Sequence, residues 1–115
     1  MPTVARMVEE IVGCKWSLAV LGRIRAGVTR PGAIRTSLAG LSTKVMNERL
    51  SKMLRFGILT RQSYDERRPR VEYSLTQLGR KVASILDQIE TLQAELDAPE
   101  SAPARQSLPG ESRAR

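Results

Sequence analysis

The side chains that could recognise a ligand in this chain are cations, hydroxyls and one amide along a predicted helix at residues 42–56. Lysine donates hydrogen bonds to guanine O6 and N7, and asparagine can pair with adenine through two hydrogen bonds. Thr43, Lys44 and Asn47 lie near the N-terminal end of this helix, the end that recognition helices insert into the major groove. We therefore predict that these three residues approach base edges.

Cations that flank these residues are better suited to phosphates than to bases. We predict that Arg30, Lys52 and Arg55 hold the DNA backbone, which fixes the register of a protein without reading sequence. Arg67 and Arg68 lie in a charged turn at residues 65–70, where guanidinium groups could bind a phosphate or enter a narrow minor groove. The full set of predicted DNA-binding residues is Arg30, Ser42, Thr43, Lys44, Asn47, Glu48, Ser51, Lys52, Arg55, Arg67, Arg68 and Arg70.

The net charge of +7 over 115 residues is concentrated in the same part of the chain. Residues 15–70 hold thirteen Lys and Arg against three acids, whereas residues 1–14 and 71–97 are both mildly acidic. Solubility alone would not need this partition, so it favours a polyanionic partner, double-stranded DNA before any other. A solvated basic surface with no ligand is the alternative that charge alone leaves open.

Turn residues and the spacing of apolar side chains predict the elements that would position these groups. Ser42 is a good helix N-cap because its hydroxyl can accept from an otherwise unpaired N–H, and Gly57 suits the end of the same helix. Gly40 allows the tight connection of a helix-turn-helix. The predicted helices are 4–12, 15–25, 31–38 and 42–56, and the predicted strands are 58–64 and 71–75. This order predicts a mainly α fold with a small β-hairpin wing, a winged helix-turn-helix.

The final predicted helix begins near Thr76 and carries apolar residues separated by 4, 3, 4, 3 and 4 positions, which is a heptad seam. Large apolar side chains contribute ~1.5–3 kcal/mol each when buried, so such a seam must be covered. Its first half could pack on the domain and its second half extends beyond it, which predicts a homodimer joined through this helix. The predicted dimerisation residues are Val82, Ile85, Ile89, Leu92 and Leu96.

The predicted organisation is one domain at residues 1–97 followed by a disordered tail at 98–115, which is rich in Pro, Ala, Ser, Glu and Arg. The sequence has no histidine, no glycine-rich phosphate loop and one cysteine, so we expect no enzyme, no cofactor and no metal site. No apolar run reaches the length of a membrane span and no signal pattern opens the chain, which predicts a cytoplasmic location without membrane contact. RNA recognition usually needs aromatic side chains for stacking, and aromatics make up only 3 %.

Five short motifs are spread over residues 7–97. They are Gly13-Cys14-Lys15-Trp16, Arg30 ahead of Ile34, Leu41-Ser42-Thr43-Lys44, Gly57-Ile58-Leu59-Thr60-Arg61 and Val71-Glu72-Tyr73-Ser74-Leu75-Thr76-Gln77-Leu78-Gly79-Arg80. Together they resemble the HxlR-type winged helix-turn-helix regulators of bacteria, relatives of the MarR group, and the last motif is quite specific. The resemblance implies a homodimeric, DNA-binding transcription factor that is joined through its terminal helices and binds operators near its target genes.

Some proteins of this type respond to electrophiles or oxidants through a cysteine near the N-terminus, and the matching place here is near Thr3. Cys14 instead replaces the second glycine of a Gly-Gly-Lys-Trp motif. Two interpretations stay open: a thiol that fills space at a helix junction and is inert, or a redox sensor activated by the charge of Lys15.

The symmetry of a dimer predicts an inverted-repeat operator with half-sites about one helical turn, or a multiple of it, apart. The alternative function is a winged-helix module used for protein assembly or for non-specific nucleic-acid binding. Protein assembly would predict affinity that is insensitive to salt and no binding to duplex DNA. No small-molecule effector is indicated by the sequence.

Overall fold

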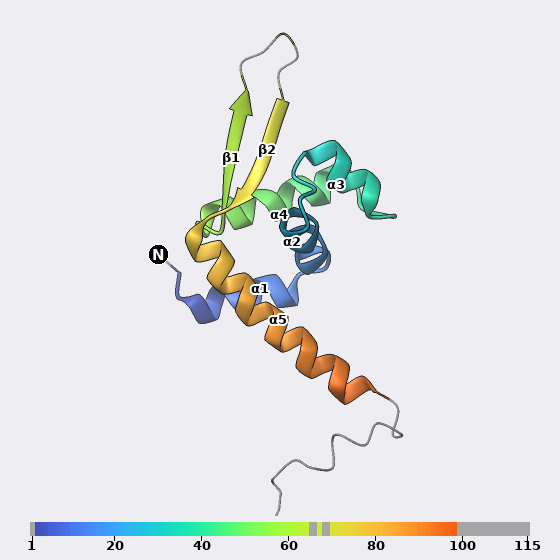
Figure 1. The fold of residues 1–115 in the computed structure, drawn as a ribbon, viewed down its shortest axis with the longest axis vertical. Helices are drawn as coiled ribbons and strands as arrows, with labels where there is room; N and C mark the ends of the chain where they lie inside the picture. Colours follow the sequence, from blue (N-terminus) through green and yellow to red (C-terminus); the bar gives the residue numbers. More distant parts are fainter. Residues whose placement is uncertain (1, 65–66, 68–69, 99–115) are drawn as a thin grey trace, which may run out of the picture. The chain divides into compact units, whose positions relative to one another are not determined.

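The computed structural model describes residues 2–64, 67 and 70–98, which form five helices and one two-stranded sheet (Figure 1). In chain order the elements are α1 Val4–Gly13, α2 Ser17–Arg25, α3 Pro31–Ser37, α4 Thr43–Arg55, β1 Leu59–Tyr64, β2 Arg70–Leu75 and α5 Gln77–Asp97. The predicted mainly α fold with a hairpin wing is confirmed. The chain divides into two compact units, Met1–Ser84 and Ile85–Arg115, and the boundary falls within α5. Residues 99–115 of the predicted tail lie outside the described residues.

Local signals in the sequence explain where α4 begins and why α2 begins two residues later than predicted. The hydroxyl of Ser42 accepts from the N–H of Val45 at 3.1 Å, so α4 starts at the predicted capping residue. The helix predicted from residue 15 starts only at Ser17. Trp16 takes a left-handed backbone conformation with φ 79°, which breaks helical geometry just before that point.

The core of the first unit is aliphatic, as the low aromatic content predicts. Its buried apolar residues are Met7, Ile11, Val20, Leu21, Ile24, Ile34, Leu38, Leu41, Met46, Leu50, Met53, Phe56, Ile58, Leu59, Tyr73, Val82 and Ala83. Val82, one of the predicted dimerisation residues, is only 1 % exposed and packs in this core, which leaves little of its side chain to contact a partner. Heptad spacing is the same for a side chain that packs inside its own protomer and for one that packs on a partner.

The connection between α3 and α4 places two leucines in the core within a tight turn. Leu38 and Leu41 are both buried, and Gly40 between them takes φ 91°, a conformation that costs glycine little. A Cβ added to Gly40 would lie 3.7 Å from Cζ2 of Trp16, so the indole lies across the turn. The residue that precedes α2 therefore braces the turn that orients α4.

The wing is an antiparallel hairpin that projects from the helices of the first unit (Figure 1). Its last described pair joins Tyr64 to Arg70, so β2 begins one residue before the predicted position 71. Arg70 is therefore a strand residue and not, as predicted, part of the turn. The N–H of Tyr73 donates to the carbonyl of Thr29 at 2.9 Å, which fastens the wing to the segment before α3.

A threonine and a glycine join the wing to the first turn of α5. The Thr76 hydroxyl donates to the Gly57 carbonyl at 2.6 Å and accepts from the Gly79 N–H at 2.8 Å. A Cβ on Gly79 would lie 2.0 Å from the Ile58 carbonyl oxygen, so no larger residue fits there without moving the backbone. These contacts explain physically why threonine and glycine stand three residues apart after the second strand.

Candidate nucleic-acid interface

The outward side of α4 gathers most of the predicted DNA-binding residues on one surface, which we call the α4 face. An open hollow of about 530 Å³ on this surface is lined by Lys44, Asn47, Glu48, Arg49, Ser51, Lys52 and Arg55. Met46, Leu50 and Met53 on the opposite side of the helix are each at most 2 % exposed. Their burial fixes the rotation of α4 about its axis and so determines which side chains face solvent.

The N-terminal end of α4 leaves its three predicted base readers accessible. Thr43, Lys44 and Asn47 are exposed, and within the described part of the chain their side chains form no hydrogen bond or ion pair. Ser42 accepts a hydrogen bond from the Val45 N–H through its hydroxyl oxygen and keeps its own O–H as a donor. This end of the helix can therefore offer donors and an amide to base edges without first breaking a contact of its own.

The two predicted phosphate contacts at the C-terminal end of α4 differ in their surroundings. Lys52 Nζ donates to Glu10 Oε1 of α1 at 2.5 Å, and Arg6 Nε donates to Glu10 Oε2 at 3.1 Å. The hydrogen bonds from Lys52 and Arg6 hold the pKa of the Glu10 carboxyl below its ordinary value of 4.5. Arg55 is exposed and, among the described residues, has no ion pair. A phosphate would have to compete with a carboxylate for Lys52, whereas it could approach Arg55 freely.

Arg49 is part of the α4 face, and sequence reasoning did not identify it. Its Nε donates to the backbone carbonyl of Lys15 at 2.8 Å, and its side chain is only 23 % exposed. A second nitrogen lies 3.8 Å from the carboxylate of Glu48 at the rim of the hollow. No local pattern indicates a bond to a carbonyl 34 residues earlier in the chain, so the sequence held no signal for this contact.

The arginines of the wing have two different environments. Arg67 is exposed, and Arg68 lies outside the described residues. The guanidinium carbon of Arg70 lies 4.6 Å from the centre of the Tyr64 ring, and its Nε lies 3.5 Å from the carboxylate of Glu72. Arg70 therefore stabilises the hairpin by a cation–π contact and an ion pair, roles that its predicted place in an exposed turn did not suggest.

Arg30 and Arg70 nevertheless lie close together, beside the end of β2 that is nearer the wing turn. They line one open hollow of about 400 Å³ together with Pro31, Gly32, Ala33 and Val71. Arg30 is the exposed residue immediately before α3. The structure thus places Arg30, a predicted phosphate contact, beside the first residues of β2. These two segments are far apart in the sequence.

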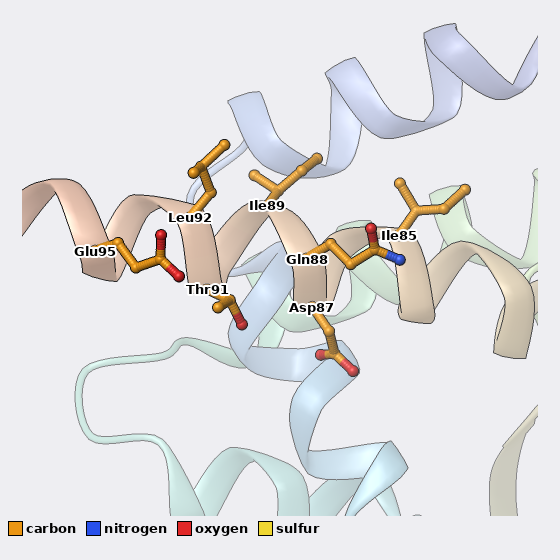
Figure 2. A pocket seen from close by; sticks show the side chains of 7 residues that line it. All are labelled: Ile85, Asp87, Gln88, Ile89, Thr91, Leu92 and Glu95. Atoms are coloured by element: carbon orange, nitrogen blue, oxygen red, sulfur yellow. The ribbon is translucent and has the colours of Figure 1, made fainter. Parts of the chain in front are cut away.

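The second unit carries an apolar surface on α5 in place of a charged one. Ile85, Ile89, Leu92 and Leu96, the α5 stripe, are 41, 38, 59 and 71 % exposed. Figure 2 shows Ile85, Ile89 and Leu92 extending from one side of the helix, while Asp87 and Thr91 extend from another. Together with Gln88 and Glu95 these five residues line an open hollow of about 540 Å³. Four of the five predicted dimerisation residues are therefore accessible to a partner.

Other kinds of site have little basis in the described residues. Cys14 is a half-buried free thiol at the end of α1, and its part in redox sensing stays a prediction. No group of three or more His, Cys, Asp or Glu that could hold a metal ion occurs in the described part of the chain. Within the same part, no helix is both long and apolar enough to cross a membrane.

Comparisons of sequence and of structure both find transcriptional regulators as relatives of this chain. The model of the HxlR-like helix-turn-helix domain matches residues 11–100. A relative from Synechocystis, described as an uncharacterised transcriptional regulator of helix-turn-helix type, is 40 % identical over 79 residues, which are 69 % of this chain. The chain spans 58 % of the length of that relative and 64 % of the length of YtcD from Bacillus subtilis, less than two thirds in both cases.

Two solved structures share the fold over most of their length. YtfH from Salmonella typhimurium, described as a transcriptional regulator, has a TM-score of 0.69 at 32 % identity, with 89 % of this chain and 90 % of that chain covered. A protein from Enterococcus faecalis, described as a transcriptional regulator of the MarR family, has a TM-score of 0.72 at 28 % identity, with 81 % and 84 % covered.

Proposed function

This chain belongs to the HxlR-like helix-turn-helix family, and we propose that it is a transcriptional regulator that binds an inverted-repeat operator in double-stranded DNA as a homodimer. The α4 face is the observation that carries this proposal. Lys44, Asn47, Ser51 and Arg55 are exposed on a helix whose opposite side is buried in the core. A helix held in this way fits the major groove of B-DNA, which is wide enough to admit it.

Base readout is assigned to the N-terminal end of α4. Asn47 can pair with adenine through two hydrogen bonds, and Lys44 can donate to guanine. Thr43 can donate to, or accept from, either kind of base pair through its hydroxyl. The accessibility of all three side chains supports these roles.

Phosphate contacts are assigned to cations at the C-terminal end of α4, before α3 and in the wing, because such contacts set register and supply salt-dependent affinity. Arg55 is exposed at the C-terminal end of α4, Arg30 is exposed immediately before α3, and Arg67 is exposed in the wing. Arg70 shares a hollow with Arg30 and so could add to the positive charge beside Arg30. Each phosphate that the protein neutralises should add about 0.9 to the slope of log affinity against log salt.

Dimerisation is assigned to the α5 stripe. Four large aliphatic side chains in a row, 38 to 71 % exposed, are unusual on the surface of a monomer and suit a second copy of the same helix. An isologous contact of this kind would give the pair a two-fold axis. That axis is the reason for expecting an inverted repeat in the operator.

The proposal can be tested by selecting duplexes that bind the purified protein from a library of random sequence. We expect the recovered duplexes to share an inverted repeat with half-sites about one helical turn, or a multiple of it, apart. Recovery of no common sequence would contradict the proposal and favour the alternative, non-specific nucleic-acid binding or a role in protein assembly. Recovery of a single half-site would contradict the homodimer alone.

A further inference from the structure

Two side chains of the α4 face form hydrogen bonds to distant parts of the protein. Lys52 Nζ donates to the carboxylate of Glu10, and Arg49 Nε donates to the carbonyl of Lys15. The two donors stand three residues apart, on neighbouring turns of α4. Their acceptors lie near the end of α1 and just after it, 42 and 34 residues earlier in the chain. All four residues belong to the first unit.

Two hydrogen bonds on neighbouring turns add directional constraints to the packing of α4. Burial of Met46, Leu50 and Met53 sets which side of the helix faces the core. Hydrogen bonds have narrow ranges of distance and angle, so those of Arg49 and Lys52 act as anchors that further restrict rotation of α4 and shifts along its axis. Asn47 lies on the same helix between the N-cap and these anchors, and its placement follows from theirs.

The Glu10 anchor is itself held in place. Arg6 donates to the second carboxylate oxygen at 3.1 Å from one turn earlier on α1, so the carboxylate is oriented before it meets Lys52. The side chains of Glu10 and Lys52 are 22 and 37 % exposed, so this ion pair is partly buried. Glu10 thus presents a fixed acceptor to α4.

We propose that Glu10 is a positioning residue for DNA recognition, which acts through Lys52 to hold the recognition helix at the setting that base readout requires. Helix α1 then takes part in sequence discrimination without touching DNA. Lys52 is an anchor of the helix and not a phosphate contact. This inference rests on the proposed function and deepens it, since bidentate base contacts need side chains held within about 0.5 Å of their productive geometry.

The test compares Glu10→Gln with Glu9→Gln, which removes the same charge from the next residue of the same helix. Glu9 is exposed and has no hydrogen bond or ion pair among the described residues. We expect Glu10→Gln to lower the preference for the selected operator over a scrambled duplex by about tenfold, the equivalent of weakening readout at one base pair. Glu9→Gln should leave that preference unchanged. A preference that is equal in both variants would overturn the inference.

A second pair of measurements separates an anchor from a phosphate contact. If Lys52 is an anchor, Lys52→Gln and the double variant Glu10→Gln/Lys52→Gln should lose the same preference as Glu10→Gln alone, since the three variants break one interaction. The salt slope should stay the same in all of them. If Lys52 binds phosphate, Lys52→Gln should lower the slope by about 0.9, and Glu10→Gln should raise affinity by freeing the lysine. That second pattern would overturn the inference.

The unmodified protein, measured in the same series, distinguishes failure of the proposed function from failure of this inference alone. Equal binding to the operator and to the scrambled duplex would overturn the proposed function, and this inference with it. A specific unmodified protein whose Glu10→Gln variant is equally specific would overturn the inference alone. Thermal unfolding of each variant ensures that the comparison is made on folded protein.

Discussion

The α4 face and the α5 stripe are both exposed sides of amphipathic helices, yet their chemistry is opposite. The hollows along them are nearly equal in volume, about 530 and 540 Å³. Four cations, an amide, a hydroxyl and the carboxylate of Glu48 line the first, and Ile85, Ile89 and Leu92 stand among polar residues in the second. Helical periodicity alone can tell which side of a helix is available. The class of residue on that side indicates the partner, phosphates and bases for one helix and a second apolar surface for the other.

The two surfaces should also respond differently to salt. Cations that neutralise phosphates release counterions, so DNA binding weakens steeply as salt rises. Burial of aliphatic side chains depends on apolar area and is not screened in this way. The comparison therefore predicts that dimer formation survives salt concentrations at which DNA binding has largely disappeared.

The largest expected effect comes from placing charge on the α5 stripe. The double variant Ile89→Glu/Leu92→Glu should dissociate the dimer, because two carboxylates would have to be buried without partners. Operator affinity should then fall by about 10²–10⁴-fold, the range by which linked sites exceed single ones. Sedimentation equilibrium and operator titration measure the two consequences.

Ala94→Glu is the matched control for this variant, since residue 94 is exposed on α5 but lies outside the stripe. It should remain dimeric and bind the operator normally. A double variant that stays dimeric would show that the stripe is not the interface and would break the comparison.

The next effect in size concerns base readout on the α4 face. Asn47→Ala should reduce discrimination at one or two base pairs by about 1–3 kcal/mol and leave affinity for a scrambled duplex unchanged. Titration of operators with single base-pair changes measures this loss. Gln77→Ala removes an exposed amide from the same unit outside the α4 face and serves as control. An equal loss of affinity for every sequence would contradict the role of Asn47 as a reader.

Removal of one phosphate contact should have a smaller and less selective effect. Arg55→Gln should weaken binding to the operator and to a scrambled duplex alike, and it should lower the salt slope by about 0.9. Lys81→Gln, an exposed lysine on α5, is the control and should change neither quantity. Arg55→Gln with an unchanged slope would remove Arg55 from the set of phosphate contacts.

The smallest expected effect is on thermal stability. Its dependence on pH tests the ion pair that joins α1 to the α4 face. The pKa of Glu10 lies below its ordinary value of 4.5 because Lys52 and Arg6 hydrogen-bond to the charged form. A pKa that is lower in the folded state stabilises the fold above pH 4.5, and this contribution is lost as the pH falls through the folded value. Glu10→Gln should therefore unfold at a slightly lower temperature than the unmodified protein at neutral pH. The difference should shrink below pH 4.5, and a difference that persists in acid would contradict the ion pair as its source.

The fold was largely predictable because its signals are local. The N-cap at Ser42 and the turn at Gly40 follow from the chemistry of single residues, and the spacing of Met46, Leu50 and Met53 gives the buried side of α4. The end of the wing was less predictable. Whether Arg70 belongs to a turn or to a strand depends on its pairing with Tyr64, which a sequence pattern does not contain.

The parts of the candidate site that could not be predicted depend on contacts between distant segments. Lys52 and Arg49 look alike in the sequence as cations on the polar side of a helix. Only the approach of α1 gives one a carboxylate and the other a carbonyl. Val82 was assigned to a dimer for a related reason, because heptad spacing does not tell a core from an interface.

The most direct test of the central claim is fluorescence anisotropy of the purified protein with the duplex recovered by selection and with a scrambled duplex, from about 50 to 200 mM salt. We expect binding to both duplexes to weaken as salt rises, with a slope of about −0.9 for each phosphate neutralised. Preference for the selected duplex should persist at the higher salt, because base contacts do not depend on counterion release. Equal binding to the two duplexes, vanishing together as salt rises, would contradict the claim that the α4 face reads sequence.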